Sequence, residues 1–229
     1  MGLQLFRTDY LVRICIDMTY KVLNLYACLG GNRYKWTDCE VTAVELDPEL
    51  AGLYQERFPH DKVIIADAHQ YLLDHYKEFD FIWSSPPCPS HSDIRRCGVH
   101  AGQYEALYPE MSLYQEIILL KNFAPKETMF IVENVKPYYE PLIPPDIKLH
   151  RHLYWCNFKI SSFVVEDDRK HSDIQGYSSV YGFDIKHTEI KDKRKALRNM
   201  VDPDLGLHIF NCARNIITQP KTLQPQLFP

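Results

Sequence analysis

The chain has 229 residues, of which 45% are hydrophobic, 24% are charged and nine are glycine, and its formal net charge is −4. This apolar content excludes an intrinsically disordered chain, and the low glycine content excludes a collagen-like one. Seven cysteines without a CxxC pair argue against a disulfide framework or a zinc site and predict a reducing, cytoplasmic environment. No apolar run approaches the roughly 18–20 residues that span a bilayer, so we expect a soluble protein with no membrane partner.

The predicted elements alternate between strand and helix from residue 20 onward. Strands are expected at 20–26, 41–46, 63–66, 79–83 and 129–133, and helices at 48–58, 68–76 and 107–123. This alternation predicts an α/β fold with a doubly wound, mostly parallel sheet. Beyond it we expect a strand at 153–165, a polar loop-rich stretch at 172–195 and a terminal helix at 203–217, whereas residues 1–19 match no motif.

Three residues at successive predicted strand ends indicate an adenosine site, because ligands of such sheets bind beyond the carboxyl ends of the strands. Gly30 lies in the turn after the first strand, where the backbone can approach a ligand closely. Glu45 ends the second strand and could accept both ribose hydroxyls, although a carboxylate at a helix start is an equally good interpretation. Asp67 ends the third strand and could accept from an adenine amino group, although a helix cap is the better interpretation of this residue alone.

Cys88 and Glu133 are the candidate catalytic pair. Cys88 follows two prolines directly after the fourth strand, and the prolines fix a turn that exposes the thiol to the predicted cleft. Glu133 ends the fifth strand, which we expect to lie beside the fourth. A thiol nucleophile with a carboxyl proton donor suits conjugate addition to an electron-poor ring together with protonation of a ring nitrogen.

Contact with nucleic acid would need a local basic patch, because the chain is acidic overall. The best candidate stretch is 186–198, and a smaller one contains Arg95 and Arg96. Taken alone, such a charge run is more often a solvated helix face.

Taken together, these motifs resemble the S-adenosylmethionine-dependent cytosine carbon-5 DNA methyltransferases. The matching stretches are NLYACLGG at 24–31, VELDP at 44–48, ADAHQYL at 66–72, SPPCPSHS at 85–92, ENV at 133–135 and RNMVDP at 198–203. The short length and the SPPCPSHS form look more like a stand-alone phage or prophage enzyme than a large restriction-modification partner.

The resemblance implies a class I methyltransferase fold of the Rossmann-like type, S-adenosylmethionine as the cofactor, double-stranded DNA as the partner and no metal. It implies catalytic roles for Cys88, Glu133 and Arg151, the last from HRHLYW at 150–155. Implied cofactor contacts are Tyr26, Ala27, Leu29, Gly30, Glu45, Leu46, Asp67, Ala68, Ser85, Pro86 and Asn199. Implied DNA contacts are Ser92, Arg95, Arg96, Lys191, Lys193, Arg194 and Lys195, and residues 89–103 would form a mobile loop that closes over a flipped base.

The same resemblance divides the chain into an N-terminal extension, 1–19, a catalytic domain, 20–148 with 196–217, a reduced target-recognition region, 149–195, and a tail, 218–229. Asn24 stands where the family usually has Asp, Cys28 replaces a glycine, and Pro89 replaces the usual Gln. Three alternatives stay open: an amino-group methyltransferase of adenine N6 or cytosine N4, an RNA cytosine methyltransferase, and an inactive DNA-binding subunit. A homo-oligomer or a specificity partner is a further expectation.

Overall fold

The computed structural model describes residues 19–149, 151–163, 176, 181, 185, 188, 190 and 192–216. The predicted N-terminal extension and C-terminal tail lie almost entirely outside these residues. The same holds for most of the stretch 164–191. Among the described residues, no helix is long and apolar enough to cross a membrane.

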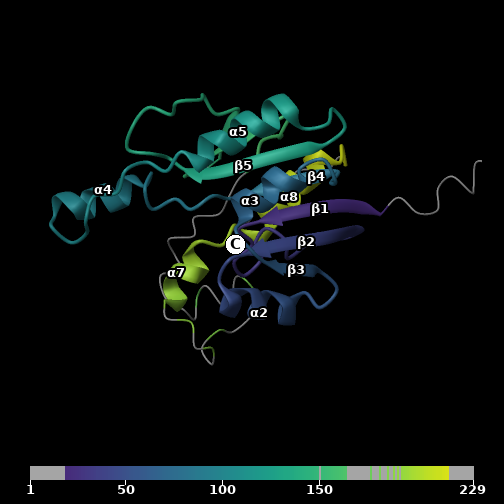
Figure 1. The fold of residues 1–229 in the computed structure, drawn as a ribbon, viewed down its shortest axis with the longest axis horizontal. Helices are drawn as coiled ribbons and strands as arrows, with labels where there is room; N and C mark the ends of the chain where they lie inside the picture. The colour runs from purple at the N-terminus through teal and green to yellow at the C-terminus, as the bar shows by residue number, and fades with distance from the viewer. Residues whose placement is uncertain are drawn as a thin grey trace, which may run out of the picture.

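The described residues form a seven-stranded sheet between two layers of helices (Figure 1). The strands are β1 (Tyr20–Leu25), β2 (Cys39–Glu45), β3 (Lys62–Ile65), β4 (Phe81–Ser84), β5 (Met129–Val135), β6 (Ile147–Leu149) and β7 (His152–Cys156). The helices are α2 (Pro48–Arg57), α3 (Ala68–His75), α4 (Asp93–His100), α5 (Ser112–Phe123), α7 (Lys193–Arg198) and α8 (Pro203–Ala213).

The strand order is β3-β2-β1-β4-β5-β7-β6, with β1 to β5 parallel and β6 and β7 antiparallel to their neighbours. The chain reverses direction across the sheet between β1 and β4, which is where ligands bind in open parallel sheets. In Figure 1 the arrowheads of β1, β2 and β5 point the same way, and α4 and α7 lie beyond that edge. The doubly wound, mostly parallel sheet expected from the sequence is therefore confirmed.

Alternation along each strand divides the apolar core between the two faces of the sheet. Leu23, Ile82 and Val132 face α3 and α5, whereas their neighbours in sequence face α8. On the α8 face, the ring of Trp36 stacks on Phe210 with 4.8 Å between ring centroids. Both faces are thus covered by helices, as a parallel sheet requires.

Several predicted elements have other bounds in the structure; the terminal helix predicted at 203–217, for example, is α8 and ends at Ala213. Helix α5 begins at Ser112 rather than at 107, and a strand predicted at 153–165 ends at Cys156. Residues 89–103, predicted as a loop, contain helix α4, whose Ser92 side chain accepts a hydrogen bond from the Arg95 amide at 3.4 Å. The three-residue strand β6 was not predicted at all.

Glycine at position 30 is required by packing and by backbone conformation. Its φ is +70°, and a Cβ there would lie 2.4 Å from Cε2 of Phe58 on the chain that follows α2. We expect Gly30→Ala to lower the free energy of unfolding by about 2–4 kcal/mol, from left-handed strain plus overpacking. Gly52→Ala is the control, because Gly52 is exposed within α2 with open space around it, and should stabilise by about 0.5–1 kcal/mol. Urea denaturation measures both changes, and a stabilised Gly30→Ala variant would contradict this account.

Candidate active site

The predicted nucleophile turn, Ser85 to Cys88, follows β4 directly and leads into α4. The amides of His91 and Ser92 each donate to the carbonyl of Cys88 at 3.0 Å, and Nδ2 of Asn134 donates to the carbonyl of Pro86 at 3.0 Å. The thiol of Cys88 is half-buried. Burial raises the pKa of this thiol, and the negative charge of Glu133 raises it further. Cys88 is therefore a protonated thiol in the absence of substrate, and a nucleophilic role requires its proton to leave on binding.

Glu133 lies on β5, the strand next to β4, and its carboxyl group is buried. The hydroxyl of Ser85 donates to its Oε2 at 2.9 Å, and Nε2 of His152 lies 3.6 Å from its Oε1. Burial raises the pKa of Glu133 to about 7, although the Ser85 hydrogen bond and the charge of Arg151 oppose the shift. The carboxyl group is consequently divided between its protonated and ionised forms near neutral pH, as a proton donor should be.

Two consecutive serines at the end of β4 bind two different carboxylates. Ser84 donates to Oε2 of Glu116 at 2.5 Å on the α5 face of the sheet, whereas Ser85 donates to Glu133 on the opposite face. The Trp83 indole, which lies on the same face as Ser85, donates to the Ser85 hydroxyl at 2.8 Å. The chain leading to Cys88 is therefore fixed from both faces of the sheet.

The turn after β1 holds two non-glycine residues in the left-handed region. Tyr26 has φ 56° and Cys28 has φ 47°. The Cys28 amide donates to Oε2 of Glu45 at 2.8 Å, and the Asp47 amide donates to its Oε1 at 3.0 Å. An ionised carboxylate can accept about four hydrogen bonds, so Glu45 retains capacity for two hydroxyl groups.

The predicted cofactor contacts divide into exposed and buried residues. Leu46 is 65% exposed directly after Glu45, and Tyr26 is half-buried, so an apolar side chain, an aromatic ring and a carboxylate meet at this edge. This combination suits the base and ribose of an adenosine group, and the cofactor that the sequence predicts fits here. Five further predicted contacts are buried residues, so any contact from them would come through the backbone: Ala27, Leu29, Gly30, Ala68 and Pro86.

Asp67 serves as the cap of α3, because its Oδ1 accepts from the Gln70 amide at 2.8 Å. This is the helix-cap alternative from the sequence, and the second carboxylate oxygen is left for a ligand. Asn199 is exposed at the C-terminal end of α7. A Cβ on Gly31 would lie 2.5 Å from the carbonyl of Val201, so the chain just after Asn199 packs against the turn that follows β1.

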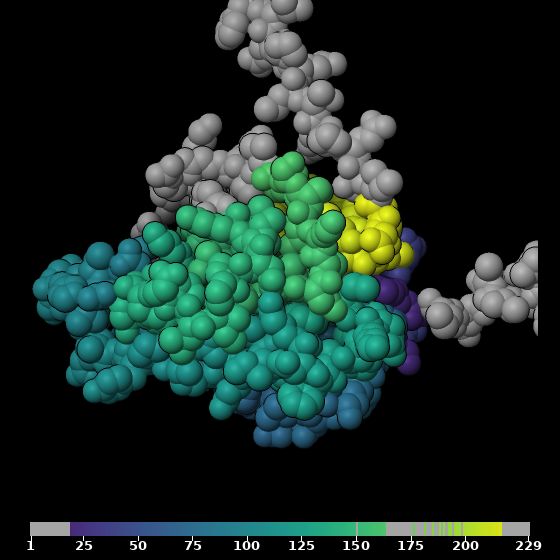
Figure 2. Space-filling view, turned by 90° about the horizontal axis from the view of Figure 1, so that it is seen from above, coloured from purple at the N-terminus to yellow at the C-terminus, as the bar shows by residue number. Residues whose placement is uncertain are grey.

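Of the residues predicted to contact DNA, some bond to other parts of the protein and some lie outside the described residues. Arg95 lies over the ring of Tyr104 and donates to the carbonyl of Glu105 at 3.3 Å, and Arg96 donates to the carbonyl of Tyr138 at 3.1 Å. These two guanidinium groups therefore hold α4 and its following loop, which stand out from the body of the molecule in Figure 2. Lys195 is exposed on α7 and Lys193 is half-buried there, whereas Lys186, Lys191 and the side chain of Arg194 lie outside the described residues. Arg151 is exposed before β7, and its charge lowers the pKa of both Cys88 and Glu133.

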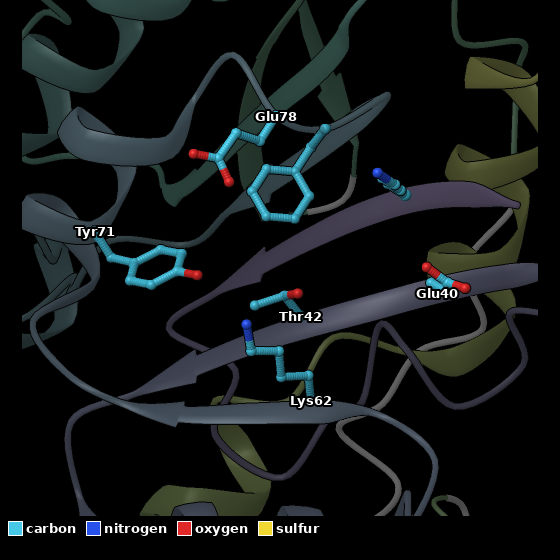
Figure 3. A pocket seen from close by; sticks show the side chains of 7 residues that line it. Glu40, Thr42, Lys62, Tyr71 and Glu78 are labelled. Carbon is cyan, nitrogen blue, oxygen red and sulfur yellow. The ribbon is translucent and has the colours of Figure 1, made fainter.

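A hollow of about 420 Å³ lies on the sheet at some distance from this edge (Figure 3). Lys21, Glu40, Thr42 and Lys62 on β1 to β3 line it, with Tyr71 of α3 opposite. None of the predicted site residues lines this hollow.

Sequence reasoning missed Glu116, which is fully buried on α5 and binds three side chains. The signal was present, because Glu116 falls on the apolar stripe formed by Leu113, Ile117 and Leu120. A carboxylate on the buried face of a helix needs hydrogen-bond donors around it, but the spacing of residues along α5 does not identify which donors they are.

Among solved structures, the chain resembles several methyltransferases at low identity. It is 14% identical to a SAM-dependent methyltransferase from Agrobacterium tumefaciens, with a TM-score of 0.37, covering 57% of this chain and 44% of that one. It is 22% identical to a DNMT2 mutant from Spodoptera frugiperda, with a TM-score of 0.34, covering 51% and 36%. For the putative methyltransferase yhhF from Escherichia coli the identity is 13% and the TM-score 0.41, covering 65% and 80%. The chain thus spans less than half of the Agrobacterium protein.

A search of curated proteins gave no match. The model of the family described as C-5 cytosine-specific DNA methylase matches residues 20–141, which contain β1 to β5, the turn after β1, Cys88 and Glu133. Because this match covers more than half of the 229 residues, the chain belongs to the C-5 cytosine-specific DNA methylase family, whose members are S-adenosylmethionine-dependent methyltransferases.

Proposed function

We propose that this protein transfers a methyl group to carbon 5 of a cytosine in DNA through a covalent adduct with Cys88. The observation that carries the proposal is the pair of neighbouring strand ends that bear Cys88 and Glu133, with the pKa of Glu133 raised to about 7. A buried carboxyl group that keeps its proton near neutral pH can donate to a ring nitrogen that carries no proton of its own.

In this mechanism, Cys88 adds to ring carbon 6 while Glu133 donates a proton or a hydrogen bond to ring nitrogen 3. The Ser85 hydroxyl, which donates to Oε2 of Glu133, orients the carboxyl group. When bound, S-adenosylmethionine would supply an electrophilic methyl group next to ring carbon 5. After methyl transfer to carbon 5, a base removes the carbon-5 proton, the bond between Cys88 and carbon 6 breaks, and the proton on ring nitrogen 3 returns to Glu133, which restores the aromatic ring.

The target cytosine has to leave the base stack to reach a half-buried thiol, so we propose a flipped base in double-stranded DNA. Arg151 would stabilise the ionised forms of both catalytic groups. Helix α7 lies at the same edge of the sheet in Figure 1, and its exposed Lys195 would contact phosphate. We further propose that residues 149–195 form a reduced target-recognition region. We also propose that the protein acts in the cytoplasm of a bacterial or phage-infected cell.

Bisulfite sequencing of plasmid DNA from cells that express the chain tests the proposal. Protected cytosines are expected with the wild-type chain and none with Cys88→Ala. Nucleoside analysis of the hydrolysed plasmid identifies the methylated base, and methylated adenine or N4-methylcytosine in place of 5-methylcytosine would instead assign the chain to amino-group transfer.

Glu45→Gln is expected to weaken binding of S-adenosylhomocysteine by about 1–3 kcal/mol, the range for a hydrogen bond to a charged group. In the wild type, the backbone amide of Cys28 donates to one carboxylate oxygen and that of Asp47 donates to the other. The glutamine side chain keeps only one acceptor oxygen, so it cannot accept both bonds. Glu40→Gln is the matched control, because Glu40 is exposed near the other end of the same strand and should leave affinity unchanged. Calorimetry measures both, and an unaltered affinity in Glu45→Gln would remove Glu45 from the ribose site.

A further inference from the structure

Glu116 is a fully buried carboxylate that accepts hydrogen bonds from three side chains. The Tyr26 hydroxyl donates to its Oε1 at 2.6 Å, the Ser84 hydroxyl donates to its Oε2 at 2.5 Å, and Nδ1 of His69 lies 3.0 Å from Oε1. The exposed fraction of Glu116 is 0%. Burying a charge is costly unless donors surround it, and here donors bind both carboxylate oxygens.

The three donors come from three different segments, none of which neighbours α5 in sequence. Tyr26 lies in the turn after β1, Ser84 is the last residue of β4, and His69 belongs to the first turn of α3. Glu116 therefore joins the turn proposed to hold the cofactor to the strand end that leads into the proposed nucleophile turn.

The Tyr26 bond constrains a residue whose backbone is unusual. Tyr26 has φ 56°, a conformation that tyrosine rarely adopts, so it persists only where surrounding contacts hold it. The side chain is half-buried at the same edge as Glu45 and Leu46. A hydroxyl anchored at the far end of the ring fixes the plane of the ring as well as the backbone.

The Ser84 bond acts on the other side of the site. The Ser84 side chain is fully buried, and only three residues separate it from Cys88. A shift of Ser84 would displace the Ser85 hydroxyl, which donates to Glu133, and the two prolines that carry the thiol.

We propose that Glu116 is a positioning residue that holds the Tyr26 ring against the bound adenosine group. Glu116 would also fix the position of the nucleophile turn relative to that group. This inference rests on the proposed function. It predicts that loss of the Glu116 carboxylate weakens cofactor binding and also slows methyl transfer when the cofactor is saturating, because one group fixes both turns.

The first measurement reports on the network without any cofactor. The hydrogen bond to Glu116 raises the pKa of His69, and the carboxylates of Asp67 and Glu110 add to the shift. Titration of the His69 ring by NMR, assigned with His69→Gln, should show a lower pKa in Glu116→Gln than in the wild type. The control is Glu127→Gln, an exposed carboxylate just after α5, which should leave the His69 titration unchanged.

The second measurement is affinity for S-adenosylhomocysteine by calorimetry, together with the single-turnover methylation rate at saturating S-adenosylmethionine. We expect Glu116→Gln to lose about 10- to 30-fold in affinity and a similar factor in rate, and Tyr26→Phe to lose about 3- to 10-fold in affinity alone. Tyr26→Phe leaves the Ser84 and His69 bonds intact and keeps the proposal testable if Glu116→Gln does not fold. Adding Tyr26→Phe to Glu116→Gln should cost less than in the wild-type background, since the bond it removes is already lost.

The outcomes separate this inference from the proposed function. A wild type that binds cofactor and methylates DNA, with a Glu116→Gln variant of lower melting temperature but equal affinity and rate, assigns Glu116 to stability alone and overturns the inference. An unchanged His69 titration in Glu116→Gln also overturns it, because the network would then be absent. A wild type that binds neither S-adenosylmethionine nor S-adenosylhomocysteine overturns the proposed function, and this inference with it.

Discussion

Cys88→Ala is expected to abolish methyl transfer while leaving cofactor affinity nearly unchanged. The thiol lies beyond β4 on a turn that Asn134 and two following amides fix, and the proposed adenosine contacts lie on the turns after β1 and β2. Removal of a covalent nucleophile typically costs several orders of magnitude in rate, because the reaction loses its two-step route.

A cytosine with fluorine at carbon 5 provides the measurement. Such a ring cannot lose its substituent as a proton, so the adduct with Cys88 should accumulate after methyl transfer and survive denaturation. Cys97 is the matched control, since it is exposed on α4 nine residues further on. Cys97→Ala should still form the adduct. Methylation that persists in Cys88→Ala would refute the covalent mechanism and favour direct transfer to an exocyclic amino group.

Glu133→Gln is expected to slow adduct formation by about 10²- to 10⁴-fold, because a neutral amide has no proton to transfer to the ring. The same substitution should change how stability depends on pH. The pKa of Glu133 is about 7 in the folded chain and 4.5 in the absence of burial. Below pH 4.5 the carboxyl group is protonated in both the folded and the unfolded chain, so folding buries no charge. Between pH 4.5 and 7 the unfolded chain ionises first, so the free energy of unfolding falls by about 1.4 kcal/mol per pH unit.

The expected total loss from this residue is about 3 kcal/mol by pH 8, and Glu133→Gln should not show it. Urea denaturation of both proteins at pH 5 and pH 8 measures the difference, which should grow with pH in favour of the variant. Glu127→Gln changes an exposed carboxylate and should follow the wild type at both pH values. A parallel pH dependence of wild type and Glu133→Gln would show that the buried carboxyl group titrates normally.

The five parallel strands and the starts of α2 and α3 could be predicted because local chemistry determines them. Pro48 follows an aspartate whose side chain accepts from the amides of Glu49 and Leu50, and Asp67 caps α3 in the same way. Helix α4 was missed because it is only eight residues long and polar overall: Asp93, Arg95 and Arg96 fill its first turns, and Ile94 is 78% exposed rather than packed on the core. Strand β6 is three residues long and is defined by pairing with β7, which no local pattern reveals.

The candidate site shows the same division between local and distant information. Cys88, Glu133 and Glu45 stand at strand ends, so the alternation of elements was sufficient to bring them to one edge. The bond from Tyr26 to Glu116 joins residues ninety positions apart, and a donor on one segment does not identify its acceptor on another. The packing of Gly30 was likewise not visible in the sequence, since a Cβ at this position would meet the rings of Tyr54 and Phe58, which lie more than twenty positions away.

The two serines at the end of β4 limit how the length of this chain can vary during evolution. Side chains alternate along an extended strand, so inserting or deleting one residue within β4, before Ser84, would exchange the faces of Ser84 and Ser85. Each hydroxyl would then point away from its carboxylate, and the cysteine would move by one residue's rise along the strand. The exposed loop after α4 carries no such constraint, because Gly102 and Tyr108 face open solvent. New sequence can therefore be gained at that loop without disturbing the spacing on which the chemistry depends.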